Sequence, residues 1–301
     1  MEKSVKLVWL ANENEMFEEE WIRMLFKGMR NLSFEVVYDT DRTTIYKNAV
    51  IVCNHADHKI PYDDYFQKYE DAKVPFAAIH LSDEILGVSY KFYDYQMCKV
   101  VFRNYFHPDH MSNPKVRVFG LGYKTGFASA PSIYEATPWY HWCFVGTIHN
   151  QERAKNVAIY EPIIPHFLIA GDTFGKGVDI ATYKRIMELS KFSLCLMGQC
   201  NVDTFRLYEA MEANSVPIVL GKTPSQDCQP SYWHFMFPWE KDLPFIIVNS
   251  WEEGFEKMKE YLYKPLEYMQ LRARMQNFWK ETKEIWSNMF ERELSSSLFC
   301  D

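Results

Sequence analysis

Arg206 and Glu209 stand three residues apart in "DTFRLYEA" (203–210), which has the composition of a helix that begins after a polar loop. Their order opposes helix stability, because a cation in the first turn opposes the helix dipole and an acidic residue is favoured before its basic partner. A helix N-terminus that carries an arginine can bind phosphate. A carboxylate one turn later can accept hydrogen bonds from the two hydroxyls of a ribose. We therefore predict a nucleoside diphosphate site, with a surface Arg–Glu pair worth ~0.2–0.5 kcal/mol as the alternative.

The elements around these residues would place them at the edge of a sheet. A predicted strand at 192–198 precedes them, and Asp203 in the intervening loop is the expected N-cap. A second predicted strand follows at 216–221. In open α/β sheets, ligands bind beyond the carboxyl ends of the strands, where helices begin. The loop and the start of the helix thus occupy a predicted ligand-binding position.

The same alternation of strands and helices runs through the chain. Predicted strands occupy 5–11, 34–39, 49–54, 74–81, 98–105, 115–123, 141–148, 166–172, 192–198, 216–221 and 243–249. Predicted helices occupy 13–29, 62–71, a segment from about 151, 179–191 and a tail at 251–294 with a break near Lys264-Pro265. The strands are continuously apolar, which is typical of a parallel sheet covered on both faces.

This pattern predicts an α/β protein with two Rossmann-like domains that face each other across a cleft. The predicted N-terminal domain is 1–135, and the predicted C-terminal domain is 136–265. Residues 124–140 contain Gly, Ser and Pro without periodicity and are the predicted linker. The helices at 266–301 are expected to pack back toward the N-terminal domain.

Composition excludes several classes of function. A chain of 301 residues exceeds one ordinary core, which favours two domains. A net charge of −7 without a long basic run predicts neither a nucleic-acid partner nor binding to an anionic membrane surface. The start, "MEKSVKLVWLANENEMFEEEW", lacks the apolar core of a signal peptide, and no membrane insertion is predicted. Seven cysteines without a CxxC pair favour a reduced, cytoplasmic protein.

The segment 192–221, "FSLCLMGQCNVDTFRLYEAMEANSVPIVLG", resembles the donor-site signature of exostosin-like (family 47) glycosyltransferases. That signature is an apolar strand, a loop, D-[ST]-x-R-x-x-E-A, a small-residue turn and a second apolar strand. The run "WCFVG" with Arg153 shortly after it resembles the start of the same donor domain. The segments "IHLSDE", "VVFRNYF" and "FGLGYKTGF" resemble the ribitol xylosyltransferase branch and soluble exostosin-like enzymes of large algal viruses. The sequence departs from the animal family in showing no N-terminal anchor and in having Asn214-Ser215 at the turn.

The resemblance implies a GT-B fold, a UDP-sugar donor with xylose favoured, and inversion at the anomeric carbon without a metal or other cofactor. The domain at 1–135 would bind the acceptor, and the domain at 136–265 would bind the nucleotide-sugar donor. The acceptor would be a hydroxyl of an oligosaccharide or glycoprotein glycan, including a viral capsid glycan made in host cytoplasm. Arg206 and Arg153 would hold the diphosphate and stabilise its charge as the sugar leaves. The implied donor site also includes Asn201, Asp203, Glu209 and Lys222. For Lys222, a solvated turn is the alternative.

An inverting transfer needs a base that takes the proton of the acceptor hydroxyl. The exit of the predicted strand at 74–81 offers Asp83 first and Glu84 second, although either could instead cap the following helix. His55, after "AVIVC", is the third candidate. Arg103 follows another strand and could bind the acceptor, bind the donor phosphate or pair with a carboxylate.

Three other functions fit parts of the sequence. A metal enzyme could use ligands in "CNHADH" (53–58) and "HPDH" (107–110), but neither HExxH nor paired CxxC occurs. A dehydrogenase would need G-x-G-x-x-G after a first strand, which "WLANEN" and "FVGTIHNQ" do not supply. A non-catalytic nucleotide-sugar or glycan-binding protein would keep Arg206 and Glu209 and need no base.

Overall fold

Parallel pairing organises the apolar runs into two separate sheets. The computed structural model describes residues 3–13, 15–54, 62–84, 91–133, 137–148, 150–171, 177–222 and 231–299. The chain forms two units, one of Met1–Leu121 with Thr282–Asp301 and one of Gly122–Glu281. The predicted domain boundaries lie after 135 and after 265, so the structure divides the chain earlier at the first boundary and later at the second.

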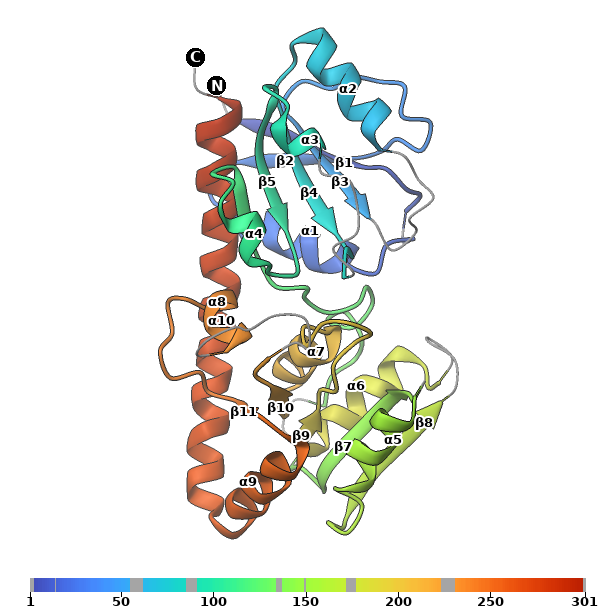
Figure 1. The fold of residues 1–301 in the computed structure, drawn as a ribbon, viewed down its shortest axis with the longest axis vertical. Helices are drawn as coiled ribbons and strands as arrows, with labels where there is room; N and C mark the ends of the chain where they lie inside the picture. The colour runs from blue at the N-terminus through green and yellow to red at the C-terminus, as the bar shows by residue number, and fades with distance from the viewer. Residues whose placement is uncertain are drawn as a thin grey trace. The chain divides into compact units, whose positions relative to one another are not determined.

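The sheet of the first unit has the strand order β2-β1-β3-β4-β5-β6, and all its pairs are parallel (Figure 1). Its strands are β1 (Ser4–Trp9), β2 (Ser33–Tyr38), β3 (Ala49–Asn54), β4 (Phe76–Leu81), β5 (Cys98–Arg103) and β6 (Val116–Val118). Its helices are α1 (Glu19–Lys27), α2 (Asp63–Ala72), α3 (Lys91–Asp94), α4 (Pro108–Met111) and the last part of α10 (Pro265–Leu298). Because the chain leaves β1 for β2 on one side and reaches β3 on the other, the strand order reverses between β1 and β3.

Helices cover both faces of this sheet, as the continuously apolar strands predict. On one face, the aromatic side chains of α2 and α3 pack on β3, β4 and β5, where Phe66 and Phe92 stack with ring centroids 4.2 Å apart. On the other face, Phe290 of α10 stacks on Phe102 of β5 with centroids 3.9 Å apart. Trp286 of α10 meets Trp21 of α1 edge to face. The last part of α10 is therefore part of the core of the first unit.

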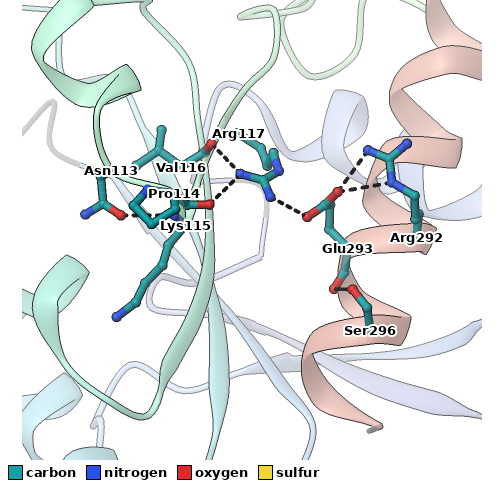
Figure 2. Close-up of polar contacts among 8 residues, drawn as sticks. All are labelled: Asn113, Pro114, Lys115, Val116, Arg117, Arg292, Glu293 and Ser296. Carbon is teal, nitrogen blue, oxygen red and sulfur yellow. Dashed lines mark hydrogen bonds and ion pairs between the residues drawn. The ribbon is translucent and has the colours of Figure 1, made fainter.

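Polar contacts also fix α10 to the edge of the first sheet (Figure 2). Nη2 of Arg117 on β6 lies 2.9 Å from Oε2 of Glu293 on α10. The Nη1 group of Arg117 donates to the carbonyls of Pro114 and Val116, which holds the guanidinium in place. This half-buried pair joins segments that are far apart in the sequence.

The sheet of the second unit has the order β11-β10-β9-β7-β8, again with parallel pairs (Figure 1). Its strands are β7 (Tyr140–Thr147), β8 (His166–Gly171), β9 (Ser190–Leu194), β10 (Val216–Leu220) and β11 (Ile246–Val248). Its helices are α5 (Gln151–Ala158), α6 (Ile180–Glu188), α7 (Phe205–Glu212), α8 (Tyr232–Met236), α9 (Trp251–Tyr263) and the first part of α10. The strand order reverses between β7 and β9.

The segment predicted as a linker, 124–140, belongs to the second unit, and its contacts explain why. Nζ of Lys184 on α6 donates to the carbonyls of Ala128 and Ala130 at 3.0 and 2.8 Å. The carboxylate of Glu188 accepts from the backbone N–H of Ile133 at 3.0 Å. The lack of periodicity in this segment reflects an irregular chain that α6 holds through its backbone.

Every predicted strand corresponds to an observed one, and the main differences are at element ends. The strand predicted at 115–123 is only β6, three residues long. The helix predicted from 13 begins at Glu19, because the side chain of Glu15 accepts hydrogen bonds from Asn12 and holds a turn there. The predicted break in the tail is confirmed, since α9 ends at Tyr263 and α10 begins at Pro265.

Candidate functional site

The carboxyl end of β7 is where the second sheet reverses its strand order. At such a point the loops that follow two neighbouring strands diverge and leave room for a ligand. Helix α5 follows β7 after Asn150, whose side chain caps it by accepting from the N–H of Arg153 at 2.8 Å. Helix α7 follows β9 after a longer loop. Two helix N-termini therefore follow the two strands that flank the switch point.

Arg206, in the first turn of α7, lies over the end of β7. Its Nη2 donates to the carbonyl of Val145 at 3.2 Å, and its Cζ lies 4.9 Å from the centroid of the Phe144 ring. A Cβ atom on Gly146 would come within 2.4 Å of Nη2, so only glycine leaves room for the guanidinium there. Among the described residues, Nε of Arg206 is buried without a hydrogen-bond partner and no carboxylate forms an ion pair with the side chain. Within the described part of the chain, a carbonyl and an aromatic ring thus hold the guanidinium.

Arg153, in the first turn of α5, approaches the same strand end. Its Nη1 donates to the carbonyl of Thr147 at 2.8 Å, and its Nη2 lies 3.5 Å from the carbonyl of Leu196, beyond β9. The side chain thus spans the two strand ends and is 9% exposed. Two guanidinium groups, from α5 and from α7, therefore bond to carbonyls two residues apart at the end of β7.

Glu209 is not a surface residue, and the alternative of a surface Arg–Glu pair is wrong. Its side chain is 3% exposed, and the ion pairs of the described residues do not include one with Arg206. Oε2 accepts from the hydroxyl of Tyr183 on α6 at 2.8 Å, and Oε1 accepts from the N–H of Lys124 at 3.3 Å. Burial raises the pKa of Glu209, and the hydrogen bond from Tyr183 and the charge of Arg206 oppose that rise.

The loop before α7 is built from buried polar side chains. Asn201 and Asp203 are each 1% exposed, and Oδ1 of Asn201 accepts from the N–H of Asp203 at 2.9 Å. The N-cap of α7 is Thr204, so the prediction of Asp203 as the N-cap is wrong. The carboxylate of Asp203 instead accepts from the hydroxyl of Tyr232 at 3.4 Å. Lys222 is half-buried, two residues beyond the end of β10.

In the first unit, two of the predicted site residues form a buried ion pair. Nη2 of Arg103 lies 3.4 Å from Oδ2 of Asp83, and the two side chains are 0% and 1% exposed. Arg103 also donates to the hydroxyl of Tyr93 at 3.3 Å, and that hydroxyl lies 2.6 Å from Nδ1 of His80. Of the roles open to Arg103, the structure shows the pairing with a carboxylate. Glu84 is half-buried beside Asp83.

The remaining candidates from the sequence are His55 and the metal-ligand segments. His55 lies outside the described residues, as do Asp57 and His58. Within the described part of the chain, no three His, Cys, Asp or Glu side chains form a group that could hold a metal ion. His107 is the N-cap of α4, and its Nδ1 accepts from the N–H of Asp109 at 3.2 Å.

Two residues of interest, Gly146 and Glu18, were not identified from the sequence. Gly146 makes room for Arg206, and its place at the end of "WCFVG" was the available signal. Glu18 is fully buried at the start of α1, and its hydrogen bond with Ser82 joins α1 to the exit of β4. Glu18 and Glu19 are both buried, and no pattern in the acidic run "FEEEW" distinguishes them from Glu20, so no sequence signal could have found Glu18.

One family model matches part of the chain. Residues 176–299 match the family model described as the RXYLT1 C-terminal domain. The resemblance to ribitol xylosyltransferases is confirmed. The matched residues include Arg206 and Glu209 but neither Arg153 nor the first 175 residues of the chain. The likeness to algal-virus enzymes stays a prediction, and a comparison with curated proteins finds no match.

Solved structures confirm the fold over almost the whole chain. An α1,3-fucosyltransferase aligns with a TM-score of 0.51 and 11% identity, over 94% of this chain and 90% of its own. The Anabaena protein Alr3699/HepE, in complex with UDP-glucose, aligns with a TM-score of 0.55 and 8% identity, over 97% of this chain and 99% of its own. An α1,3-fucosyltransferase structure with GDP aligns with a TM-score of 0.50 and 11% identity, over 94% and 91%.

The chain therefore has the GT-B fold of two Rossmann-like domains, as predicted. The family match and the fold together support a glycosyltransferase. None of the described helices combines the length and the apolar character that crossing a membrane requires.

Proposed function

We propose that this protein is an inverting glycosyltransferase that transfers a sugar, xylose first, from a UDP-sugar to a hydroxyl of a glycan. The observation that carries the proposal is that Arg206 and Arg153 bond to carbonyls two residues apart near the end of β7, where Arg206 has no ion pair with any described carboxylate. Two guanidinium groups at helix N-termini suit a diphosphate, whose oxygens accept charge-assisted hydrogen bonds. The fold likeness to proteins solved with UDP-glucose and with GDP supports a nucleotide donor.

Each residue of the donor site has a proposed task. Arg206 and Arg153 neutralise the charge that develops on the leaving diphosphate, so the reaction needs no metal. Glu209 binds the ribose, because each of its carboxylate oxygens keeps a lone pair beyond the internal bond it already accepts. Asn201, Asp203 and Lys222 complete the surroundings of the nucleotide. The favoured acceptor is an oligosaccharide or glycoprotein glycan, with viral capsid glycan synthesis in the cytoplasm as the proposed setting.

The first test measures binding. The melting temperature of the purified protein is followed in EDTA with UDP, UDP-xylose, UDP-glucose, GDP and NAD. A nucleotide at 100 times its Kd should stabilise the fold by about 2.7 kcal/mol. We expect UDP to raise the melting temperature and one UDP-sugar to raise it further. Absence of any shift with these nucleotides would contradict the donor site, and binding that requires added metal would contradict the metal-free mechanism.

A matched pair of variants ties the binding to Arg206. Arg206→Ala should weaken UDP binding by about 10- to 150-fold, since a hydrogen bond to a charged group is worth ~1.5–3 kcal/mol. Arg185→Ala is the control, because Arg185 is an exposed arginine on α6 of the same unit. Equal UDP affinity in the two variants would refute the assignment. Release of UDP from the bound UDP-sugar then separates an enzyme from the alternative, a protein that only binds nucleotide sugars.

A further inference from the structure

Tyr183, near the start of α6, reaches Glu209 on α7. Its hydroxyl donates to Oε2 of Glu209 at 2.8 Å. The start of α6 is fixed, because the side chain of Asp179 caps it by accepting from the N–H of Thr182 at 2.9 Å. The ring of Tyr183 also packs edge to face on Phe127, with centroids 5.7 Å apart. A capped backbone and a packed ring therefore hold the Tyr183 hydroxyl against Glu209.

The other oxygen of Glu209 has its own donor. Oε1 accepts from the N–H of Lys124 at 3.3 Å. The chain that follows Lys124 is held by α6, where Nζ of Lys184 donates to the carbonyls of Ala128 and Ala130. A carboxylate has about two lone-pair sites on each oxygen, so one site on each remains for a ligand. Because both internal bonds come from groups that are themselves held, they also fix the plane of the carboxylate.

The protonation states suit these bonds. Burial and the neighbouring Glu209 carboxylate raise the pKa of Tyr183 well above its usual range, so the hydroxyl keeps its proton and acts as the donor. Burial also raises the pKa of Glu209, and the hydrogen bond from Tyr183 is the largest of the effects that oppose this rise. Tyr183 therefore favours the ionised form of Glu209, which accepts hydrogen bonds at both oxygens.

The carboxylate lies close to Arg206 and just below the surface of the second unit. Glu209 is about one helical turn beyond Arg206 on α7, and the charge of Arg206 acts on both Glu209 and Tyr183. Glu209 is 3% exposed, whereas Lys124, Tyr183 and Arg206 are half-buried. All of these residues belong to Gly122–Glu281. The arrangement therefore depends on the second unit alone.

We propose that Tyr183 is a positioning residue that makes the donor site selective for ribonucleotides over 2′-deoxyribonucleotides, an inference that rests on the proposed function. The fixed carboxylate of Glu209 offers one acceptor site to each of the two ribose hydroxyls. A 2′-deoxyribose supplies only one donor, so the second site loses water without gaining a partner, and affinity falls. Without the Tyr183 hydroxyl, the carboxylate turns to suit a single hydroxyl, and the two kinds of nucleotide bind more alike.

The test compares UDP with 2′-deoxy-UDP by isothermal titration of the full chain. Wild type should bind UDP about 10- to 150-fold more tightly, the effect of one hydrogen bond to a charged group. Tyr183→Phe should lower this ratio of affinities by about 2- to 10-fold, because UDP loses more affinity than 2′-deoxy-UDP. The ratio is the decisive quantity, since a general disturbance of the fold weakens the binding of both nucleotides alike.

Tyr160→Phe is the matched control. Tyr160 is buried in the same unit, and its hydroxyl also donates a hydrogen bond, to the carbonyl of Trp251 at 2.9 Å. Its removal should lower the free energy of unfolding and leave the ratio of affinities unchanged. Tyr183→Phe keeps the ring that packs on Phe127, so this variant should also fold.

A double variant tests whether Tyr183 acts through Glu209. Glu209→Gln should itself lower the ratio of affinities, because its amide is uncharged. Adding Tyr183→Phe to Glu209→Gln should then change the ratio by less than about twofold, since the effects of two groups that act as one unit are not additive. Independent effects of the two substitutions would contradict the positioning role.

The outcomes separate failure of this inference from failure of the proposed function. A lower ratio in Tyr183→Phe, with Tyr160→Phe unaffected and no further change in the double variant, supports the inference. A wild-type ratio in Tyr183→Phe overturns it, as does equal binding of the two nucleotides by the wild-type protein, and in both cases the UDP site itself stands. If the wild-type protein binds neither nucleotide, the proposed function has failed and the inference fails with it.

Discussion

The two units each place an arginine near the carboxyl edge of a parallel sheet, and they treat its charge differently. In the first unit, Arg103 is 0% exposed, and its charge is balanced by Asp83 at 3.4 Å with Tyr93 as a further acceptor. In the second unit, Arg206 rests on the Phe144 ring and the carbonyl of Val145, and no described carboxylate forms an ion pair with it. Arg103 is the last residue of β5 and Arg206 lies in the first turn of the helix after β9, so a place near a strand end does not by itself distinguish their roles.

The two arginines differ in the partner that neutralises the charge of each guanidinium group. A buried charge is expensive unless a partner of opposite sign accompanies it, so Arg103 and Asp83 need one another for folding. Arg206 remains half-buried, and its Nε has no hydrogen-bond partner among the residues that the structure describes, which suits an anionic ligand. We infer that the balanced arginine serves the fold and the unbalanced one serves binding.

The largest expected effect comes from breaking the balanced pair. Arg103→Met should lower the free energy of unfolding by about 3–5 kcal/mol, because Asp83 would be left buried without its partner. Urea denaturation of the purified variant measures the change. The Arg103→Met/Asp83→Leu double variant is the control and should recover most of the loss, since it removes both charges. If Arg103→Met is as stable as wild type, the ion pair is not needed for folding. The proposed difference between Arg103 and Arg206 would then be contradicted.

A second prediction concerns Glu18, a buried carboxylate of the first unit that forms no ion pair with any residue the structure describes. Burial raises its pKa in the folded state from 4.5 to about 7, so the folded protein binds a proton more tightly than the unfolded chain. The stability from this proton is fully present below about pH 4.5 and is lost as pH rises through about 7. Between these limits wild type should lose about 3 kcal/mol that Glu18→Gln does not lose.

Urea denaturation of wild type and Glu18→Gln at pH 4.5, 6, 7 and 8.5 checks this prediction. The stability of the variant relative to wild type should increase steadily across the series. A constant difference in the free energy of unfolding would show that Glu18 does not titrate between pH 4.5 and pH 8.5. The prediction of a raised pKa would then be contradicted.

The sequence predicted the elements far better than the pairings between them. Continuous apolar runs such as "AVIVCN" define strands buried on both faces, and β3 spans those same six residues. The resemblance around Arg206 also predicted the match to the family model over 176–299, because that motif is local. Arg103 and Asp83 are 20 positions apart in the sequence and are brought together by the pairing of β4 with β5. No rule of residue spacing predicts such a pair. The prediction of Asp203 as the N-cap of α7 was wrong for the same reason. The carboxylate of Asp203 accepts a hydrogen bond from Tyr232 on α8, a partner 29 residues away in the sequence.

The prediction with the smallest expected effect concerns the position of the Arg206 guanidinium. It tests whether UDP binding depends on that position as well as on the charge. In Gly146→Ala, the new Cβ would lie 2.4 Å from Nη2 of Arg206 and 3.2 Å from Cζ of Phe144, so the end of the flexible arginine must move. The variant keeps both guanidinium groups and loses only the hydrogen bond to Val145. A net hydrogen bond is worth ~0.5–1.5 kcal/mol, so UDP binding should weaken by about 2- to 10-fold.

Isothermal titration with UDP measures this affinity, and Gly177→Ala is the matched control because a Cβ there meets nothing within 4 Å. The free energy of unfolding of Gly146→Ala should change by less than about 1 kcal/mol, since the displaced group is the end of a side chain that has no ion pair to lose. An affinity equal to that of the control would mean that Arg206 binds UDP from any position of its guanidinium. A fall in affinity without a fall in stability would show that the unbalanced arginine is held in position for its ligand, whereas Arg103 is held in position for the fold.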